Sequence, residues 1–284
     1  MFPNEREKYE FLRALKNFVG SLKEQISQND EWTIRGFIDI YKNIYPVSDD
    51  TKVVSKILEV HLLPYLLSFA EKINFKLELA EHQNWYPDFT FISKENSSLK
   101  FAVDLKTTYR DEKNKNFCNG FTLGSHGEYF IDRTSKKNVQ YPYGDYSGHF
   151  CVGIIYSREN FPVSNNFRIY NINELEKIPA SLKNFLFFAE EKWKIASDTQ
   201  GSGNTANIGS IKAIDDLING RGVVSLAGEK FFDDYWVNFG KLEIPDDKGG
   251  YKKLSSFSEF LAFKGLSSNL NFPKQSKKGG KRNE

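Results

Sequence analysis

Two carboxylates and a lysine occur at the ends of apolar segments, where charged side chains are unusual. Asp88 opens the apolar segment 88–92, and Asp104 and Lys106 interrupt the apolar segment 101–109. Charged side chains are rarely buried unless they are paired or bind a metal. Two neighbouring carboxylates repel each other unless a cation lies between them. These residue types fit a site for a hard divalent cation such as Mg²⁺, which prefers oxygen ligands and a substrate phosphate.

Alternation along the second segment places its charged residues on one face. Residues two apart on a strand point the same way, so Asp104 and Lys106 share a face and Val103 takes the other. If segment 88–92 pairs with this strand through a short turn, Asp88 comes close to Asp104. Lys106 could then assist a water and stabilise negative charge developing on a phosphate. The pattern indicates phosphodiester hydrolysis, although Asp-x-Lys also occurs by chance and Pro-Asp often only starts a turn.

The composition indicates a folded protein without a strongly basic surface. Of the 284 residues, 39% are hydrophobic and 27% are charged, which suits a real core rather than a disordered chain. The net charge of +2 is too small for a protein that only coats nucleic acid, but it permits a basic cleft. The two cysteines make no disulfide framework, and the N-terminus has no signal-peptide pattern. No apolar run approaches the length of a bilayer span, so we expect a cytoplasmic location and no membrane.

Helices and strands are mixed without strict alternation, which predicts an α/β fold with a mixed central β-sheet flanked by helices. Helical spacing predicts amphipathic helices over 6–26 and 49–73, the second capped near Asp50 and kinked or broken in two at Pro64. The predicted strands are short ones within 32–47 ending at Pro46 and longer ones over 88–92, 101–109 and 148–158. Residues 166–178 are predicted as a strand passing into a short helix, 185–196 as an ambiguous apolar segment, and 201–211 as a polar loop. Two further helices are predicted over 215–222 and 229–240, with turns at Gly220 and Gly240.

The chain is expected to form one domain over residues 1–272, followed by a disordered basic tail over 273–284. The tail contains lysines and an arginine but no apolar residue, so it is either solvated or in contact with an anionic partner.

The letters PD at 87–88 and DLK at 104–106 resemble the PD-(D/E)xK nuclease superfamily. A longer resemblance, from about Asp49 to about Trp236, is to the EcoRV-like type II restriction endonucleases of that superfamily. It implies a restriction-endonuclease-like fold, a homodimer on double-stranded DNA, and Mg²⁺-dependent, site-specific hydrolysis of both strands of a palindrome. It also implies a cognate methyltransferase in the host. The segments that carry the resemblance are, in order, QNWYPDFT, AVDLKTTY, YNINELEKIP and GSGNTANIGSI.

The resemblance also assigns roles by position. Asp88, Asp104 and Lys106 would be catalytic, the two aspartates would be metal ligands, and Glu59 would be an accessory metal ligand. Residues 32–46 would contribute to the dimer.

DNA-binding residues are likewise implied by the resemblance. The glycine-rich segment starting at Gly201 would read bases, since glycine lets the backbone approach base edges and asparagine can bond adenine. The family has a second threonine where this chain has Ala206. The segment 109–121 departs from the family and is expected to form a mobile loop near DNA. The implied DNA-binding residues are Gly201, Gly203, Asn204, Thr205, Asn207, Gln83, Asn84, Thr51, Lys52, Thr107, Thr108, Lys137 and Asn138.

The family's target would be GATATC, cut bluntly at the central TA step, which unstacks easily. Two alternatives stay open: a PD-(D/E)xK nuclease of DNA repair or junctions, which needs no base-reading loop, and a DNA-binding protein without catalysis. No HExxH or Cys/His cluster suggests zinc, and the GSG triplet lacks the third glycine of a dinucleotide site.

Overall fold

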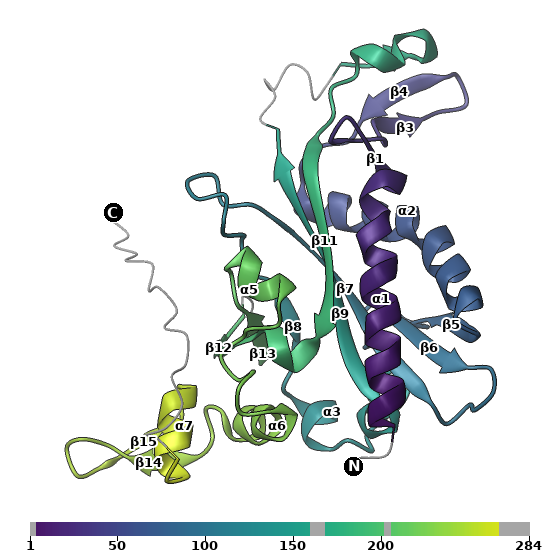
Figure 1. The fold of residues 1–284 in the computed structure, drawn as a ribbon. Coiled ribbons are helices and arrows are strands. Elements are labelled where there is room, and N and C mark those ends of the chain that lie inside the picture. The colour runs from purple at the N-terminus through teal and green to yellow at the C-terminus, as the bar shows by residue number, and fades with distance from the viewer. Residues whose placement is uncertain (1–3, 160–167, 202–205, 267–284) are drawn as a thin grey trace.

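A seven-stranded mixed sheet forms the centre of the protein in the computed structural model, which describes residues 4–159, 168–201 and 206–266 (Figure 1). The strand order is β1-β2-β11-β9-β7-β6-β5. β7 and β9 run parallel, and the other neighbours run antiparallel, so the predicted mixed α/β architecture is confirmed. The strands are β1 (Ser27–Gln28), β2 (Glu31–Trp32), β5 (Phe75–Leu79), β6 (Phe89–Ser93), β7 (Lys100–Tyr109), β9 (Gly148–Arg158) and β11 (Leu182–Glu191).

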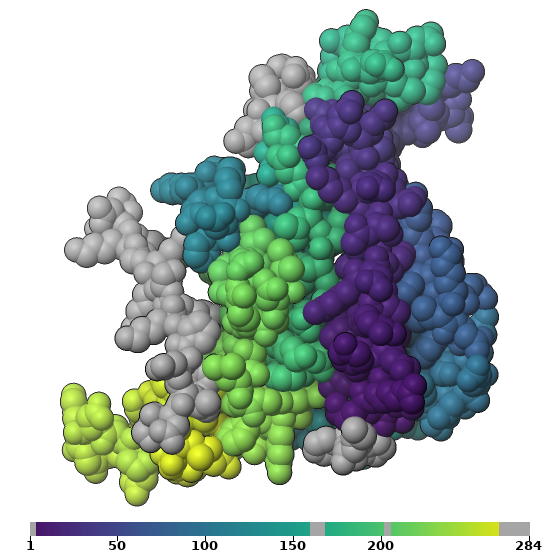
Figure 2. All heavy atoms as spheres, viewed as in Figure 1, coloured from purple at the N-terminus to yellow at the C-terminus, as the bar shows by residue number. Residues whose placement is uncertain are grey.

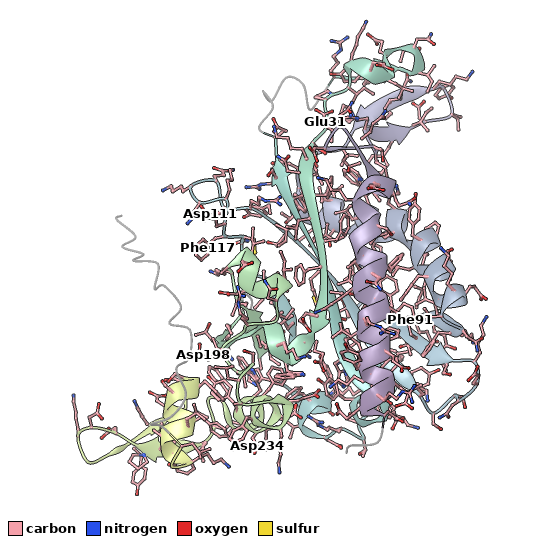
Figure 3. All side chains as sticks on the ribbon, in the orientation of Figure 1. Glu31, Phe91, Asp111, Phe117, Asp198 and Asp234 are labelled. Carbon is pink, nitrogen blue, oxygen red and sulfur yellow. The ribbon has the colours of Figure 1, made fainter. Side chains whose placement is uncertain are left out.

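Two long helices, α1 (Glu5–Ile26) and α2 (Thr51–Lys72), pack against one face of this sheet, close to their predicted bounds. α1 lies along the sheet in Figures 1 and 2, where it is drawn in purple. Phe91, labelled in Figure 3, belongs to the core under α1: its ring centroid is 5.3 Å from that of Phe11. Asp50 is the N-cap of α2, and its carboxylate accepts the first free N–H groups of the helix.

Pro64 does not break α2, which is one helix from Thr51 to Lys72, so the predicted break is wrong. Proline cannot donate to the carbonyl four residues earlier, which belongs to Val60. Val60 and Pro64 both lie on the exposed side of the helix, where water can bond that carbonyl.

By length and composition alone, α2 is the one described helix that could cross a membrane, contrary to the expectation that no segment approaches this length. It buries a stripe formed by Val54, Leu58, Leu62 and Leu66 against the central sheet. A core helix with this composition passes the same test, and the packing of α2 is that of a core helix.

The opposite face of the sheet is covered by the C-terminal half of the chain, which packs around the buried Trp236. Asp198, labelled in Figure 3, ties this half together because its carboxylate accepts the N–H of Phe257. Before β9, this side of the sheet receives β8 (Thr122–Ser125), α3 (Glu128–Ile131) and η1 (Tyr143–Asp145). The elements after β11 are η3 (Lys192–Ile195), β12 (Ala196–Gln200), β13 (Asn207–Ser210), α5 (Ile214–Ile218), α6 (Glu229–Asn238), β14 (Glu243–Pro245), β15 (Tyr251–Lys253) and α7 (Phe257–Phe263).

A second, three-stranded sheet has the order β10-β4-β3 and lies at the top of Figure 1. Its strands are β3 (Gly36–Ile38), β4 (Asn43–Pro46) and β10 (Tyr170–Asn171), and β10 passes into the short helix η2 (Ile172–Lys177), as predicted for the described part of 166–178. A capping box between Asn171 and Glu174 starts that helix. Several large apolar side chains of this sheet and of the turn between β3 and β4 face solvent: Phe37, Ile38, Ile40, Tyr41 and Tyr45.

Three segments are more regular than the sequence predicted. The ambiguous segment 185–196 is strand β11 followed by the turn η3. The second half of the polar loop 201–211 is strand β13, because Ile208 is buried and the strand pairs with both β12 and β8. The segment 109–121 is anchored by backbone bonds from Asp111 to Phe117 and from Cys118 to Lys212. The predicted tail, 273–284, lies outside the described residues.

Candidate active site

The carboxylates of Asp88 and Asp104 are held by reciprocal bonds across neighbouring strands. The pairing of Phe89 with Val103 puts Asp88 at the start of β6 opposite Asp104 on β7. The N–H of Asp88 donates to Oδ1 of Asp104 at 3.2 Å, and the N–H of Leu105 donates to Oδ2 of Asp88 at 2.8 Å. The predicted hairpin therefore brings the two acids together, with their positions fixed by main-chain atoms.

The ammonium of Lys106 lies between these carboxylates. Its Nζ is 3.0 Å from Oδ2 of Asp104 and 3.7 Å from Oδ2 of Asp88. Burial opposes the charge of Lys106, but the two carboxylates outweigh it and raise the pKa of this lysine. Lys106 thus neutralises one of two negative charges and leaves the group of three with a net negative charge.

The negative charge of Asp88 is destabilised by its surroundings. Burial, opposed by Lys106 and reinforced by Asp104, raises the pKa of Asp88 to about 6. Its side chain keeps 33% of its surface exposed, against 9% for Asp104, so it is the carboxylate that solvent or a ligand reaches first. A cation placed beside Asp88 would favour its ionised form.

Two adjoining clefts open at this point. The smaller has a volume of about 380 Å³ and is lined by Asp88, Lys106 and Thr107, by Glu59 from α2 and by Thr122 from β8. The larger, of about 680 Å³, shares Glu59, Asp88 and Thr107 and extends along the first turns of α2. A substrate lying in both clefts would pass directly over Asp88.

These residues fit a divalent cation, although the described residues contain no ready-made cluster of three metal ligands. Asp88 and Asp104 supply hard oxygen atoms, which Mg²⁺ prefers, and the destabilised charge of Asp88 is one that a cation would relieve. Glu59 does not join the pair formed by Asp88 and Asp104, because its carboxylate is in an ion pair with Lys56 at 2.7 Å. The structure therefore joins two of the three predicted metal ligands.

The predicted phosphate contacts and the predicted minor-groove residues Gln83 and Asn84 differ in their placement. Thr51, Lys52, Gln83 and Thr107 line the larger cleft. Thr108 is buried, and its hydroxyl donates to the carbonyl of Asn119 rather than facing a cleft. Asn84 is exposed in the loop before β6. Lys137 and Asn138 are exposed on another loop, where Lys137 pairs with Glu128 and the Asn138 carbonyl accepts the N–H of Tyr86.

The glycine-rich segment begins against the wall of the smaller cleft. A Cβ on Gly201 would lie 2.7 Å from Cγ2 of Thr122, so only glycine fits there without displacement. At the other end, Asn207 pairs with Ser125 of β8, and the N–H of His126 donates to the carbonyl of Ala206. Gly203, Asn204 and Thr205 lie outside the described residues.

Sequence reasoning missed Lys192, a buried lysine behind the site. Lys192 is the residue directly after β11, and its side chain enters an aromatic cage. Its Nζ lies 5.0 Å from the ring centroid of Tyr86, 5.7 Å from that of Phe130 and 5.3 Å from that of Tyr143. Within the described residues, no group accepts a hydrogen bond from its ammonium. Burial is the largest influence and lowers the pKa of Lys192 to about 8, while the charge of Asp104 opposes this. Neither a motif nor a spacing marked this residue.

Comparisons with known proteins give one family and two similar proteins. The family model described as "Restriction endonuclease EcoRV" matches residues 28–265. This match begins before Asp49, the approximate start of the resemblance in the sequence. The chain is 37% identical over 236 residues to "Type II restriction enzyme EcoRV" from Escherichia coli, which covers 82% of this chain and 93% of that protein. A solved structure, "NlaIV restriction endonuclease", has a TM-score of 0.39 and 15% identity and covers 69% of this chain and 66% of that chain.

The charge of Lys192 gives a testable dependence of stability on pH. In the folded protein its pKa is about 8 against an ordinary 10.5, so the folded state binds fewer protons between these values. The cost of the buried charge is therefore fully present below pH 8 and disappears as the pH rises towards 10.5, and the difference corresponds to ~3 kcal/mol. We expect Lys192→Met to be more stable than the parent protein at pH 7 and this advantage to shrink by pH 10, measured by urea unfolding.

Lys194→Met is the matched control. Lys194 is two residues away and pairs with Glu191, so its removal is expected to lower stability. Parallel stability curves for Lys192→Met and the parent protein between pH 7 and 10 would contradict a buried, unpaired ammonium.

Proposed function

Because the chain belongs to the EcoRV restriction endonuclease family and is a type II restriction endonuclease, a site-specific deoxyribonuclease, we propose that it cuts GATATC in double-stranded DNA with Mg²⁺, leaving blunt ends. One observation supports the chemistry most directly: Nζ of Lys106 lies within 3.7 Å of carboxylate oxygens of both Asp88 and Asp104, and Asp88 and Lys106 line an open cleft. A repair or junction nuclease could use the same three residues. The match to a type II restriction enzyme over 93% of its length favours restriction.

Asp88, Asp104 and Lys106 have different proposed roles in the reaction. Bound Mg²⁺ would supply Lewis-acid stabilisation of the phosphate and a more acidic water. Asp88 and Asp104 would hold the cation, and their backbone bonds keep both carboxylates oriented before substrate arrives. Glu59, on the α2 wall of the cleft, is the proposed accessory ligand. Lys106 presents its ammonium to the scissile phosphate and stabilises the charge that develops on its oxygen atoms.

DNA recognition is proposed for the segment from Gly201 to Asn207. Gly203, Asn204 and Thr205 contact base edges in the major groove, while Ala206 lacks the hydroxyl that the family's second threonine would offer. Gln83 and Asn84 approach the minor groove. Backbone phosphates are contacted by residues that position the duplex without reading it: Thr51, Lys52, Thr107, Thr108, Lys137 and Asn138. Thr108 would have to give up its bond to Asn119 to take part.

Homodimerisation is proposed through the sheet β10-β4-β3, whose strands β3 and β4 lie within segment 32–46. Contiguous exposed apolar side chains mark interaction surfaces, and the β3–β4 hairpin, including its turn, exposes Phe37, Ile38, Ile40 and Tyr41. A two-fold dimer reads both halves of a palindrome with the same residues. We further propose that residues 1–272 form one endonuclease domain, that the protein acts in the cytoplasm, and that a cognate methyltransferase protects the host DNA.

A digest of long DNA tests the proposed reaction. With Mg²⁺, the protein is expected to give discrete fragments whose sequenced ends are blunt and lie within GATATC, and a chelator is expected to stop cleavage. Asp104→Asn should lower the rate by about 10²-fold or more while leaving the melting temperature near that of the parent protein. Asp145→Asn, at an exposed position outside both clefts, is the control and should cut normally. Random ends, or normal cutting by Asp104→Asn, would contradict the assignment.

Base reading by Asn204 predicts a loss of discrimination. Asn204→Ala is expected to lose about 1–3 kcal/mol of preference at the base pair it reads, because a bidentate contact to that base disappears. The measurement is the ratio of kcat/KM for GATATC to that for sites with one changed base pair. An unchanged ratio at every position would remove Asn204 from the set of base-reading residues.

The proposed dimer surface can be tested by introducing a charge that dimerisation would bury. Tyr41→Glu, at a side chain that is 78% exposed in the single chain, is expected to raise the dimer dissociation constant at least tenfold. Tyr9→Glu on α1 is the matched control, since Tyr9 is 66% exposed but lies away from this sheet. Sedimentation distinguishes the 32.8 kDa monomer from the dimer. Equal dimer stability in the two variants would place the interface elsewhere.

A further inference from the structure

An ion pair occupies the junction of the two clefts. Oε1 of Glu59 lies 2.7 Å from Nζ of Lys56, one turn earlier on α2. Both side chains line the larger cleft, and Glu59 also lines the smaller cleft beside Asp88. The third predicted carboxylate is thus held by a lysine that the sequence motifs did not mark.

This pair is weak enough to be exchanged. The side chains of Lys56 and Glu59 are 58% and 37% exposed. Ion pairs three residues apart on a helix surface contribute little to stability, and solvent screens exposed pairs further. A lysine that contacts DNA also releases condensed counterions, which adds a favourable entropy that the Glu59 contact lacks. A DNA phosphate entering the cleft would therefore compete well for Lys56.

Side chains, rather than the end of the helix, have to bind phosphates on this wall. The carboxylate of Asp50 already accepts the N–H groups of Lys52 and Val53 in the first turn of α2. The same wall presents the side chains of Thr51 and Lys52, with Lys56 one turn further towards Asp88. Lys56 therefore lies between the proposed outer phosphate contacts and the proposed scissile site.

We propose that Lys56 is a phosphate-binding residue that exchanges Glu59 for a DNA phosphate when the duplex enters the cleft, which leaves the Glu59 carboxylate free beside Asp88. The proposal rests on the proposed function and adds a residue to it. Lys56 positions the duplex independently of sequence, because a single ammonium on a phosphate reads no base. Substrate binding and the release of the accessory carboxylate are then one event.

The test measures binding without metal, so it does not depend on cleavage. A 30-base-pair duplex containing GATATC is titrated with protein in a chelator across a range of salt concentrations. Each phosphate contact contributes about 0.9 to the slope of log affinity against log salt, so loss of Lys56 from both subunits should reduce the slope by roughly 1.8. Lys56→Gln is accordingly expected to bind at least about tenfold more weakly at low salt.

Two further variants separate exchange from simple charge. Glu59→Gln frees Lys56 and is expected to tighten binding in the chelator, and this gain should largely disappear in the double variant with Lys56→Gln. Lys94→Gln is the matched control, because Lys94 pairs with Glu71 at the far end of α2 and lines neither cleft. It should bind as the parent protein does.

Two results would overturn the inference. One is a Lys56→Gln slope equal to that of the parent protein. The other is a Glu59→Gln gain of the same size with and without Lys56, which would show that Glu59 only repels the duplex. Either result leaves the proposed function intact if the parent protein still cuts DNA with Mg²⁺, whereas failure of that cleavage removes the proposed function itself.

Discussion

Two main-chain hydrogen bonds across one pair of strands hold the reactive groups of this protein. The N–H of Asp88 bonds the carboxylate of Asp104, and the N–H of Leu105 bonds the carboxylate of Asp88. These bonds exist in only one register of β6 on β7, because a slip by one residue would turn every side chain of β7 to the other face. The apolar face of β7, with Phe101 and Val103 in the core under α1 and α2, fixes that register.

The rest of the molecule keeps these charges at the edge of a dry interior. On the reactive face of β7, the cage around Lys192 contains Tyr86, Tyr143 and Phe130, and Tyr86 in turn bonds His149. Such a cage excludes water and lowers the local dielectric, so charges in the site influence one another strongly. Burial raises the pKa of Asp88 and lowers that of Lys192 for this same reason.

Much of this arrangement can be read from the sequence. Alternation along 101–109 correctly separates Asp104 and Lys106 from Val103, and the short turn after β6 predicts that Asp88 meets Asp104. The family resemblance correctly predicts a type II restriction endonuclease.

Other features depend on contacts that no local pattern contains. Lys192 follows an ambiguous apolar segment, and its burial comes from rings on Tyr86, Phe130 and Tyr143, which are distant in sequence. β13 pairs with β8, which is also distant in sequence. The glycine-rich segment 201–211 therefore predicts a loop over its whole length. The resemblance implies that Thr107 and Thr108 both contact DNA, yet only Thr107 lines a cleft, because the alternation of β7 turns the hydroxyl of Thr108 inward to Asn119.

The contact between Gly201 and Thr122 bears on how discrimination between DNA sequences would affect the rate of cleavage. Thr122 forms part of the wall beside Asp88, and the backbone of Gly201 is packed so closely on it that no side chain fits between them. If the segment from Gly201 reads bases and this cleft holds the reaction, as proposed, a strained backbone on a mismatched sequence would press on the cleft itself. Errors in reading would then slow the chemical step even where the wrong duplex is held as tightly as the right one.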